Sequence, residues 1–484
     1  MNRAPSAIIF LMVLVFTFSA LSAQTNVKID KKEFKTIEDG FKEAWENIAD
    51  GDKCFSLGGG MYREAIPYYL AAIEYNPLNP ELNYKTGVCC LLGDRPEQSL
   101  QFFLSSLEAK AEVAPDILIL TGLSYQSNGD FSLAIDYYNR YSDVKKESGE
   151  TEQRVNKYIG ECKRALKMSA ESMSGELVNV GVGINSEADD YAPSPAMDNT
   201  ILYFTSRRSS GAGSTRNRSD MKYDESILLS KMVNGEWIPS EMAGKNLATE
   251  MNEGILHVNN TNDLMYLYAG WSGNGDIYVS QFTREKWTKP QAMPGAVNSD
   301  ARETSFSVTG DGNEQFFTSD RKKGGSGGRD IWYMKKIKKD KWSSPSNLGD
   351  VVNTQGNEES VWVSPGGDTL WFSSNGRNGI GGYDIYVTCR DSLGSWTSPH
   401  NMGMPVNSQW DDMFYRPVGQ DGTRAYLTSN RPGGIGGFDI YEIFMHAVDT
   451  LESVAPGLTP LIVPDSLSVP HHDQDILKMK IQFR

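Results

Sequence analysis

The sequence predicts an α+β multidomain chain, in which an all-α solenoid of helical hairpins precedes an all-β propeller of five blades. Two repeats predict it. Small and aromatic residues return every 34 to 35 positions in the first third, and a longer motif returns every 54 to 55 positions afterwards. The shorter period is typical of paired helices, and the longer one of four-stranded blades. A count of six blades is the alternative.

Residues 1–23 have the layout of a secretory signal peptide. Arg3 provides a positive start, residues 7–18 form an apolar run, and small residues precede a cleavage site near Ala23. The run is too short for a comfortable membrane span, and no later segment approaches the roughly 20 apolar residues that a span needs. A retained anchor is the alternative. Gln24 stands where a lipoprotein needs cysteine, so we expect a periplasmic chain without lipid.

Charge and cysteine content exclude some classes of function. The formal net charge of −15 disfavours binding to nucleic acid. The five cysteines show no C-x-x-C spacing and do not predict a zinc site or a disulfide framework. We expect buried free thiols, and one disulfide among the helical cysteines is the alternative in an oxidising compartment.

Residues 30–170 carry the helical repeat. Ala65 and Ser99 lie 34 positions apart, and Ser99 and Ala134 lie 35 apart, each followed by an aromatic residue four positions later on the same helical face. The repeated segments are residues 62–72, 96–106 and 131–141.

A second helix precedes the last two of these segments. Gly87 and Gly122, again 35 apart, mark where it approaches its partner closely. The same spacing places Lys53 at this position in the first pair, so the register there is uncertain. Residues 151–168 predict an amphipathic helix that caps the array.

This pattern resembles the tetratricopeptide repeat (TPR) family. The resemblance implies a curved solenoid whose concave face binds a peptide or a partner domain. The residues that it places on that face are Tyr84, Val88, Ile119, Leu123 and Gln126. Packing of these residues on the propeller or the capping helix is the alternative.

Residues 174–445 carry the second repeat. An Asp-Ile-aromatic triplet begins at Asp276, Asp330, Asp384 and Asp439, at spacings of 54, 54 and 55. Short alternating apolar segments between turn residues predict about four strands per unit. The last unit lacks the strand that carries a tryptophan in the others, and we expect residues 175–180 to complete that blade and close the ring.

The loop at residues 374–384 recurs at 429–439, with a variant at 319–330. This resembles the WD40-like or PD40 repeats of TolB-type periplasmic propellers. We expect the aspartate of each triplet to accept backbone hydrogen bonds within its loop. Calcium binding by these aspartates is the alternative.

The sequence predicts no catalytic residue, no metal site and no cofactor. Residues 324–328 match the nucleophile pattern G-x-S-x-G, but the loops that repeat it carry Ile380 and Ile435 where Ser326 stands. His471, His472 and Asp473 lie in a proline-rich segment, where adventitious metal binding is the favoured interpretation.

A basic insertion interrupts the first blade between Arg207 and Asp224. Its arginines Arg208, Arg216 and Arg218 are candidate contacts for a partner protein, and a surface loop without a binding role is the alternative.

Residues 446–484 predict an extended linker followed by a strand-like tail. The domain order resembles the PorE-like periplasmic proteins of gliding and type IX secretion bacteria, which continue into an OmpA-like peptidoglycan-binding domain. This sequence stops before that domain, so peptidoglycan binding is not implied. The resemblance implies a non-catalytic scaffold in an outer-membrane-associated complex with protein partners. The alternative is a propeller that binds a peptide or glycan in its central channel, as a sensor or an enzyme.

Overall fold

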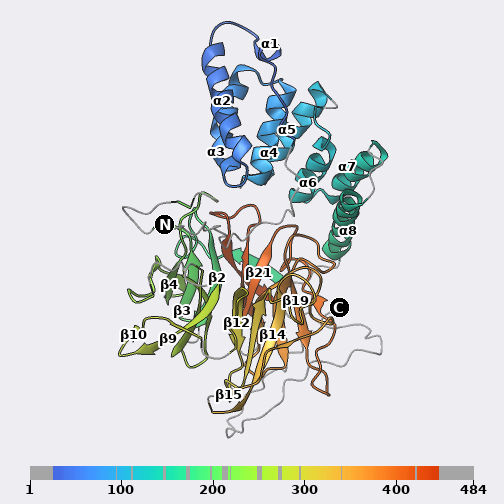
Figure 1. Cartoon of the computed structure of the whole chain (residues 1–484). Coiled ribbons are helices and arrows are strands. Elements are labelled where there is room, and N and C mark those ends of the chain that lie inside the picture. The colour runs from blue at the N-terminus through green and yellow to red at the C-terminus, as the bar shows by residue number, and fades with distance from the viewer. Residues whose placement is uncertain are drawn as a thin grey trace, which may run out of the picture.

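The protein consists of a helical domain followed by a propeller, and Figure 1 shows the helices standing on one end of the propeller. The computed structural model describes residues 25–93, 95–110, 113–144, 149–170, 175–196, 199–209, 216–217, 220–247, 253–270, 275–293, 296–339, 341–419 and 422–445. The predicted signal peptide and the predicted C-terminal strand lie outside these ranges.

The helical domain is built from hairpins, as the TPR pattern predicts. Consecutive pairs α2 and α3, α4 and α5, and α6 and α7 pack against each other, and α8 covers α7. The helices are α1 (Lys31–Phe34), α2 (Phe41–Leu57), α3 (Met61–Tyr75), α4 (Pro80–Leu92), α5 (Pro96–Ala109), α6 (Ile117–Ser127), α7 (Phe131–Val144) and α8 (Glu150–Ala170).

Each hairpin brings a glycine of its first helix against an aromatic ring of its second. A β-carbon at Gly87 would lie 2.8 Å from the ring of Phe103, and one at Gly122 would lie 2.6 Å from Tyr138. In the first hairpin this position is Gly51, which packs equally closely on Tyr69. The spacing that placed Lys53 there was wrong by two residues, because Ala65 follows Gly51 by 14 positions whereas Ser99 follows Gly87 by 12.

The propeller has five blades, and each blade is one antiparallel sheet. The first contains β2 (Asp190–Ala196), β3 (Ile201–Ser206), β4 (Ser226–Val233), β5 (Glu236–Trp237) and β6 (Glu241–Met242). The second contains β7 (Glu253–Val258), β8 (Leu264–Ala269), β9 (Asp276–Thr283), β10 (Lys286–Trp287) and β11 (Gln291–Ala292). The third contains β12 (Glu303–Val308), β13 (Glu314–Ser319), β14 (Asp330–Lys338), β15 (Lys341–Trp342) and β16 (Ser346–Asn347).

The last two blades have four strands each. The fourth contains β17 (Glu358–Val363), β18 (Thr369–Ser374), β19 (Asp384–Cys389) and β20 (His400–Asn401). The fifth contains β21 (Asp412–Val418), β22 (Arg424–Ser429), β23 (Asp439–Met445) and β1 (Gly175–Asn179).

The ring closes as predicted, because β1 is the outer strand of the fifth blade. It runs antiparallel to β23, with Gly175 opposite Met445 and Asn179 opposite Tyr441. The first and last strands of the propeller therefore share one sheet, which leaves no open blade at the point of closure.

The repeated asparagines and aspartates hold the loops between blades. Asn353 accepts from the backbone N–H of Ile331 at 2.8 Å and donates to its carbonyl at 3.0 Å. Asp384 accepts from the backbone N–H of Ile380 at 2.7 Å, and Asp330 and Asp439 accept in the same way in their loops, which confirms the predicted turn role for these three triplet aspartates. The asparagines that make the same pair of bonds are Asn185, Asn298 and Asn407.

All five cysteines are free thiols in the structure. Cys89, Cys90 and Cys162 are buried in the helical core, as predicted from the sequence. Cys54 and Cys389 are only half-buried. Burial raises the pKa of the Cys90 thiol to about 12, which keeps it protonated and unreactive at neutral pH.

Candidate interaction sites

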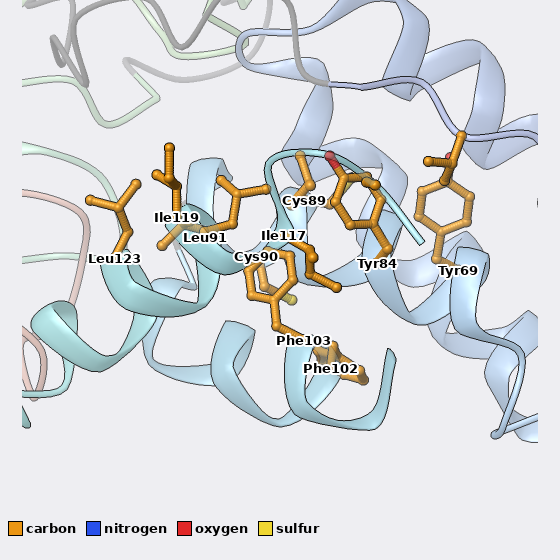
Figure 2. Close-up of a cluster of buried hydrophobic side chains, with 14 of the residues drawn as sticks. Tyr69, Tyr84, Cys89, Cys90, Leu91, Phe102, Phe103, Ile117, Ile119 and Leu123 are labelled. Carbon is orange, nitrogen blue, oxygen red and sulfur yellow. The ribbon is translucent and has the colours of Figure 1, made fainter. Parts of the chain in front are cut away.

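The five residues predicted for the concave helical face are buried, and three of them appear in Figure 2 among the core side chains of the array. None of the five exposes more than 6% of its surface. The hydroxyl of Tyr84 donates to Asp116 at 2.7 Å instead of facing solvent. The prediction of an accessible face at Tyr84, Val88, Ile119, Leu123 and Gln126 therefore does not describe this state of the protein.

The N-terminal segment contributes to this burial. Thr25 donates from its backbone N–H and its hydroxyl to the same Asp116 carboxylate, at 3.4 and 3.3 Å. Val27 and Ile29 are 9% and 4% exposed in the same core cluster as Tyr84, whereas Asn26, Lys28 and Asp30 are exposed. Residues 25–30 thus lie on the array as an extended peptide with alternate side chains pointing inward.

Gln126 has a different partner, the capping helix. Its side-chain amide donates to Glu161 of α8 at 3.0 Å and accepts from the hydroxyl of Tyr138 at 2.7 Å. Packing on the capping helix was the alternative stated for the residues of the predicted concave face, and Gln126 follows it. Burial raises the pKa of Glu161, and the nearby Lys157 opposes that shift.

Arg208 is an architectural residue of the first blade and not part of an exposed loop. It donates from Nη2 to Asp190 Oδ1 and to the carbonyl of Ile184, both at 2.6 Å, and from Nε to Ser206 at 2.8 Å. Arg321 and Arg431 make the same contacts in their own blades. Because these contacts hold the Arg208 guanidinium in the fold, the structure assigns it an architectural role, and the partner contact predicted for it stays a prediction.

Two described residues of the insertion contact the helical domain. Arg216 lies 3.3 Å from the carboxylate of Glu64 on α3, and Gly60 at the start of α3 lies against the backbone of Asp220. The partner of Arg216 in this structure is therefore the chain itself. Arg218 lies outside the described residues, and its predicted role stays a prediction.

A second set of contacts joins the helices to the fourth and fifth blades. Arg164 on α8 donates from Nε to the carbonyl of Gly379 at 2.7 Å, and Gln409 donates to the carbonyl of Ser127 at 3.1 Å. Ile380 is fully buried and belongs to the helical core cluster, although it comes from a propeller loop. We call the contacts of Gly379, Ile380 and Gln409 with the helical domain the junction.

A carboxylate with a raised pKa lies beside the junction. Burial raises the pKa of Asp411 to about 6, and the backbone N–H of Tyr383, which donates at 2.8 Å, opposes the shift. Asp412 raises the pKa further and Lys157 of α8 lowers it. The charge of Asp411 is therefore sensitive to pH just below neutrality.

Aromatic and polar groups converge at the centre of the propeller. Trp362 of β17 has its ring centroid 4.6 Å from that of His257 on β7, and the guanidinium of Arg416 on β21 lies 4.7 Å from the same indole. All three side chains are buried, so at this level they fill the space between blades. Burial lowers the pKa of His257 to about 3, so the imidazole is neutral.

Ser326 has the surroundings of a turn residue. Its backbone N–H donates to Asp330 at 2.6 Å and its hydroxyl donates to Asp350 at 2.7 Å. Across the described ranges, no group of three His, Cys, Asp or Glu side chains is placed to hold a metal ion. His471, His472 and Asp473 lie outside those ranges.

A sequence model of the tetratricopeptide repeat family matches residues 57–114, wholly within the helical domain. No curated protein matches the chain. The solved structures similar to it include a protein described as TolB from Agrobacterium tumefaciens, at 15% identity and a TM-score of 0.33, covering 56% of this chain and 88% of that one.

Two glycoside-cleaving enzymes are also similar in structure. One, described as a glycoside hydrolase, has 8% identity and a TM-score of 0.40, covering 61% of this chain and 99% of that one. The other, a β-xylosidase/α-arabinofuranosidase from a compost microbial metagenome, has 12% identity and a TM-score of 0.38, covering 60% of this chain and 100% of that one.

Proposed function

We propose that the chain is an exported, non-catalytic scaffold subunit of an outer-membrane-associated complex, of the kind that serves type IX secretion or gliding. The observation that carries the proposal is the attachment of the helical array to the propeller at two separate places. The blade 1 insertion contacts α3, and the junction contacts α6 and α8. The helical array and the propeller, both of domain types that commonly bind proteins, are thereby held in one relative orientation.

The proposed location is the periplasm. It is supported by the signal-peptide pattern of residues 1–23, which lie outside the described structure. In the part of the chain that is described, no helix is both long enough and apolar enough to cross a membrane. The proposal assigns association with the outer membrane to protein partners.

The direct test is affinity purification of the tagged, natively expressed protein from mild-detergent extracts, with identification of partners by mass spectrometry. We expect stoichiometric recovery of outer-membrane or secretion components, and an N-terminus near Gln24 in the recovered chain. Recovery of a solitary monomer would overturn the scaffold proposal, and an uncleaved N-terminus would overturn the export proposal.

Two variants test whether partner binding requires the contact between the helical array and the propeller. Ile380→Asp places a charge in the helical core, whereas Ile435→Asp makes the same change in the equivalent loop, where the side chain is 38% exposed. We expect partners to be lost from the first variant and retained by the second. The rival function, a ligand in the central channel, is less favoured because His257, Trp362 and Arg416 occupy the centre.

A further inference from the structure

The fourth blade breaks a contact that three other blades share. In those blades an arginine two residues after a buried serine forms an ion pair with the first acidic residue of the inner strand. The pairs are Arg208 with Asp190, Arg321 with Glu303 and Arg431 with Asp412.

In the fourth blade the extra residue Gly376 shifts the arginine by one position, to Arg377. Its Nη2 donates to the carbonyls of Val351 and Val352, at 2.7 and 2.6 Å, and its Nε has no partner. No ion pair joins Arg377 to Glu358, the acid of this blade. The Glu358 carboxylate instead accepts from Thr354 and Ser374.

Asn401 of the fourth blade also differs from the equivalent asparagines of two other blades. Asn347 and Asn179 donate from Nδ2 to the triplet aspartates of their blades, at 3.0 and 2.9 Å. The equivalent Asn401 makes no such bond to Asp384; its side chain lies against the hydroxyl of Tyr386, a residue that is only 3% exposed. The amide that those two blades use to hold an aspartate is therefore not committed to Asp384 in this blade.

These exceptional residues line one surface cavity of about 420 Å³. That volume lies in the range of roughly 300 to 1,000 Å³ typical of small-ligand sites. None of the lining residues is acidic. The polar ones are Thr354, Arg377, Asn378, Tyr386, His400 and Asn401.

We propose that this cavity binds a small ligand through a carboxylate group. Arg377 supplies a positive charge that no ion pair neutralises, and charge-assisted hydrogen bonds from guanidinium to carboxylate are stronger than neutral ones. Asn401 and Tyr386 add donors, and His400 lies on the exposed rim. Glu358 acts on this charge electrostatically without forming an ion pair, and a ligand carboxylate would add the direct contact that is missing. The site does not depend on the scaffold proposal.

The position of the cavity links it to the rest of the molecule. Gly376, Arg377 and Asn378 line it, and the next two residues of the same loop, Gly379 and Ile380, form the junction. A ligand that orders this loop would therefore act next to the contact that holds the two domains together.

The test is isothermal titration calorimetry of the full mature chain with matched probes. Glucuronate is compared with glucose, and N-acetyl-glycylglycine is compared with its C-terminal amide. We expect the acid of at least one pair to bind at least tenfold more tightly than its neutral counterpart. The pair that shows the difference tells whether the carboxylate comes from a sugar acid or from a peptide end.

Variants locate the binding. Arg377→Met and His400→Ala should each weaken the preferred acid, the first at least tenfold. Arg140→Met, which makes the same change of charge on the exposed face of α7, should leave it unchanged. His400 is exposed, so that variant keeps the test valid if Arg377→Met does not fold. Equal binding of acids and neutral probes, no binding at 20 mM, or unchanged binding in both site variants would overturn the proposal and leave adventitious binding only.

Discussion

Arg164 of the capping helix donates from Nε to the carbonyl oxygen of Gly379 in a propeller loop, 2.7 Å away. The next residue, Ile380, is fully buried in the helical core. The two domains therefore share hydrophobic core as well as hydrogen bonds. Removing these contacts should lower the free energy of unfolding by an amount that can be measured.

Replacing Ile380 with Ala should destabilise the helical domain by about 2 to 5 kcal/mol, because a buried isoleucine is removed from a packed core. The matched control is Ile435→Ala in the equivalent loop, which we expect to change stability by no more than about 0.5 kcal/mol. Differential scanning calorimetry of both variants checks this. Equal destabilisation of the two would show that Ile380 does not anchor the helices.

Ile29→Asp should release the N-terminal segment from the array, because it places a charge where the side chain is only 4% exposed. We expect faster amide hydrogen exchange in α4 and new binding of a hydrophobic dye to the uncovered surface. Lys28→Asp alters the charge at the neighbouring exposed position and should do neither. Identical exchange rates in the two variants would contradict the covering role of this segment.

Two glycines within helices should respond in opposite ways to alanine. Gly87→Ala should destabilise the protein by about 1 to 3 kcal/mol, because its β-carbon would meet the ring of Phe103 at 2.8 Å. Gly160→Ala in α8 meets only the end of the Arg164 side chain, with Nη1 at 3.1 Å, and a small shift of that end relieves the contact, so the variant should be neutral or gain up to about 1 kcal/mol of helix propensity. Denaturant midpoints of both variants measure the difference, and destabilisation by Gly160→Ala of the same size would contradict it.

Stability should depend on the protonation of Asp411. Its pKa rises from 3.8 to about 6 on folding, so the folded state holds this proton more tightly than the unfolded state. The contribution of this group to stability is therefore present below about pH 4 and is lost as the pH rises through 6. Asp411→Asn can still accept from Tyr383 but cannot titrate.

Compared with that variant, the wild type should lose at most about 1.4 kcal/mol of unfolding free energy per pH unit between pH 4 and 6. Urea titrations across this range provide the measurement. Parallel pH profiles for the two proteins would mean that Asp411 titrates normally.

The architecture was predictable because each type of repeated residue has the same structural role in every repeat. Gly87 and Gly122 sit where two helices touch, and the triplet aspartates sit where a loop needs an acceptor, so spacing alone reveals both repeats. The first hairpin was misregistered at Lys53, since its glycine and its small residue are 14 positions apart instead of 12, which shifts the register without changing the pattern.

The candidate sites were less predictable because they depend on contacts between distant segments. Nothing local to Tyr84 shows that Thr25 shares its partner Asp116 or that Val27 packs in the same cluster, and nothing local to Ile380 shows that it enters a helical core. The extra Gly376 before Arg377 is visible in the sequence when the loops are aligned on their serines, and this was the available signal for the cavity.

The pairing of Gly175 with Met445 has a mechanical consequence. The chain enters the propeller from the helical domain and leaves it toward the C-terminus at the same end of the β1–β23 ladder. A force pulling the helices away from whatever follows Met445 would load that ladder as a zipper, breaking its hydrogen bonds one after another instead of all together. The seam that closes the ring is thus the place where tension along the chain would open it.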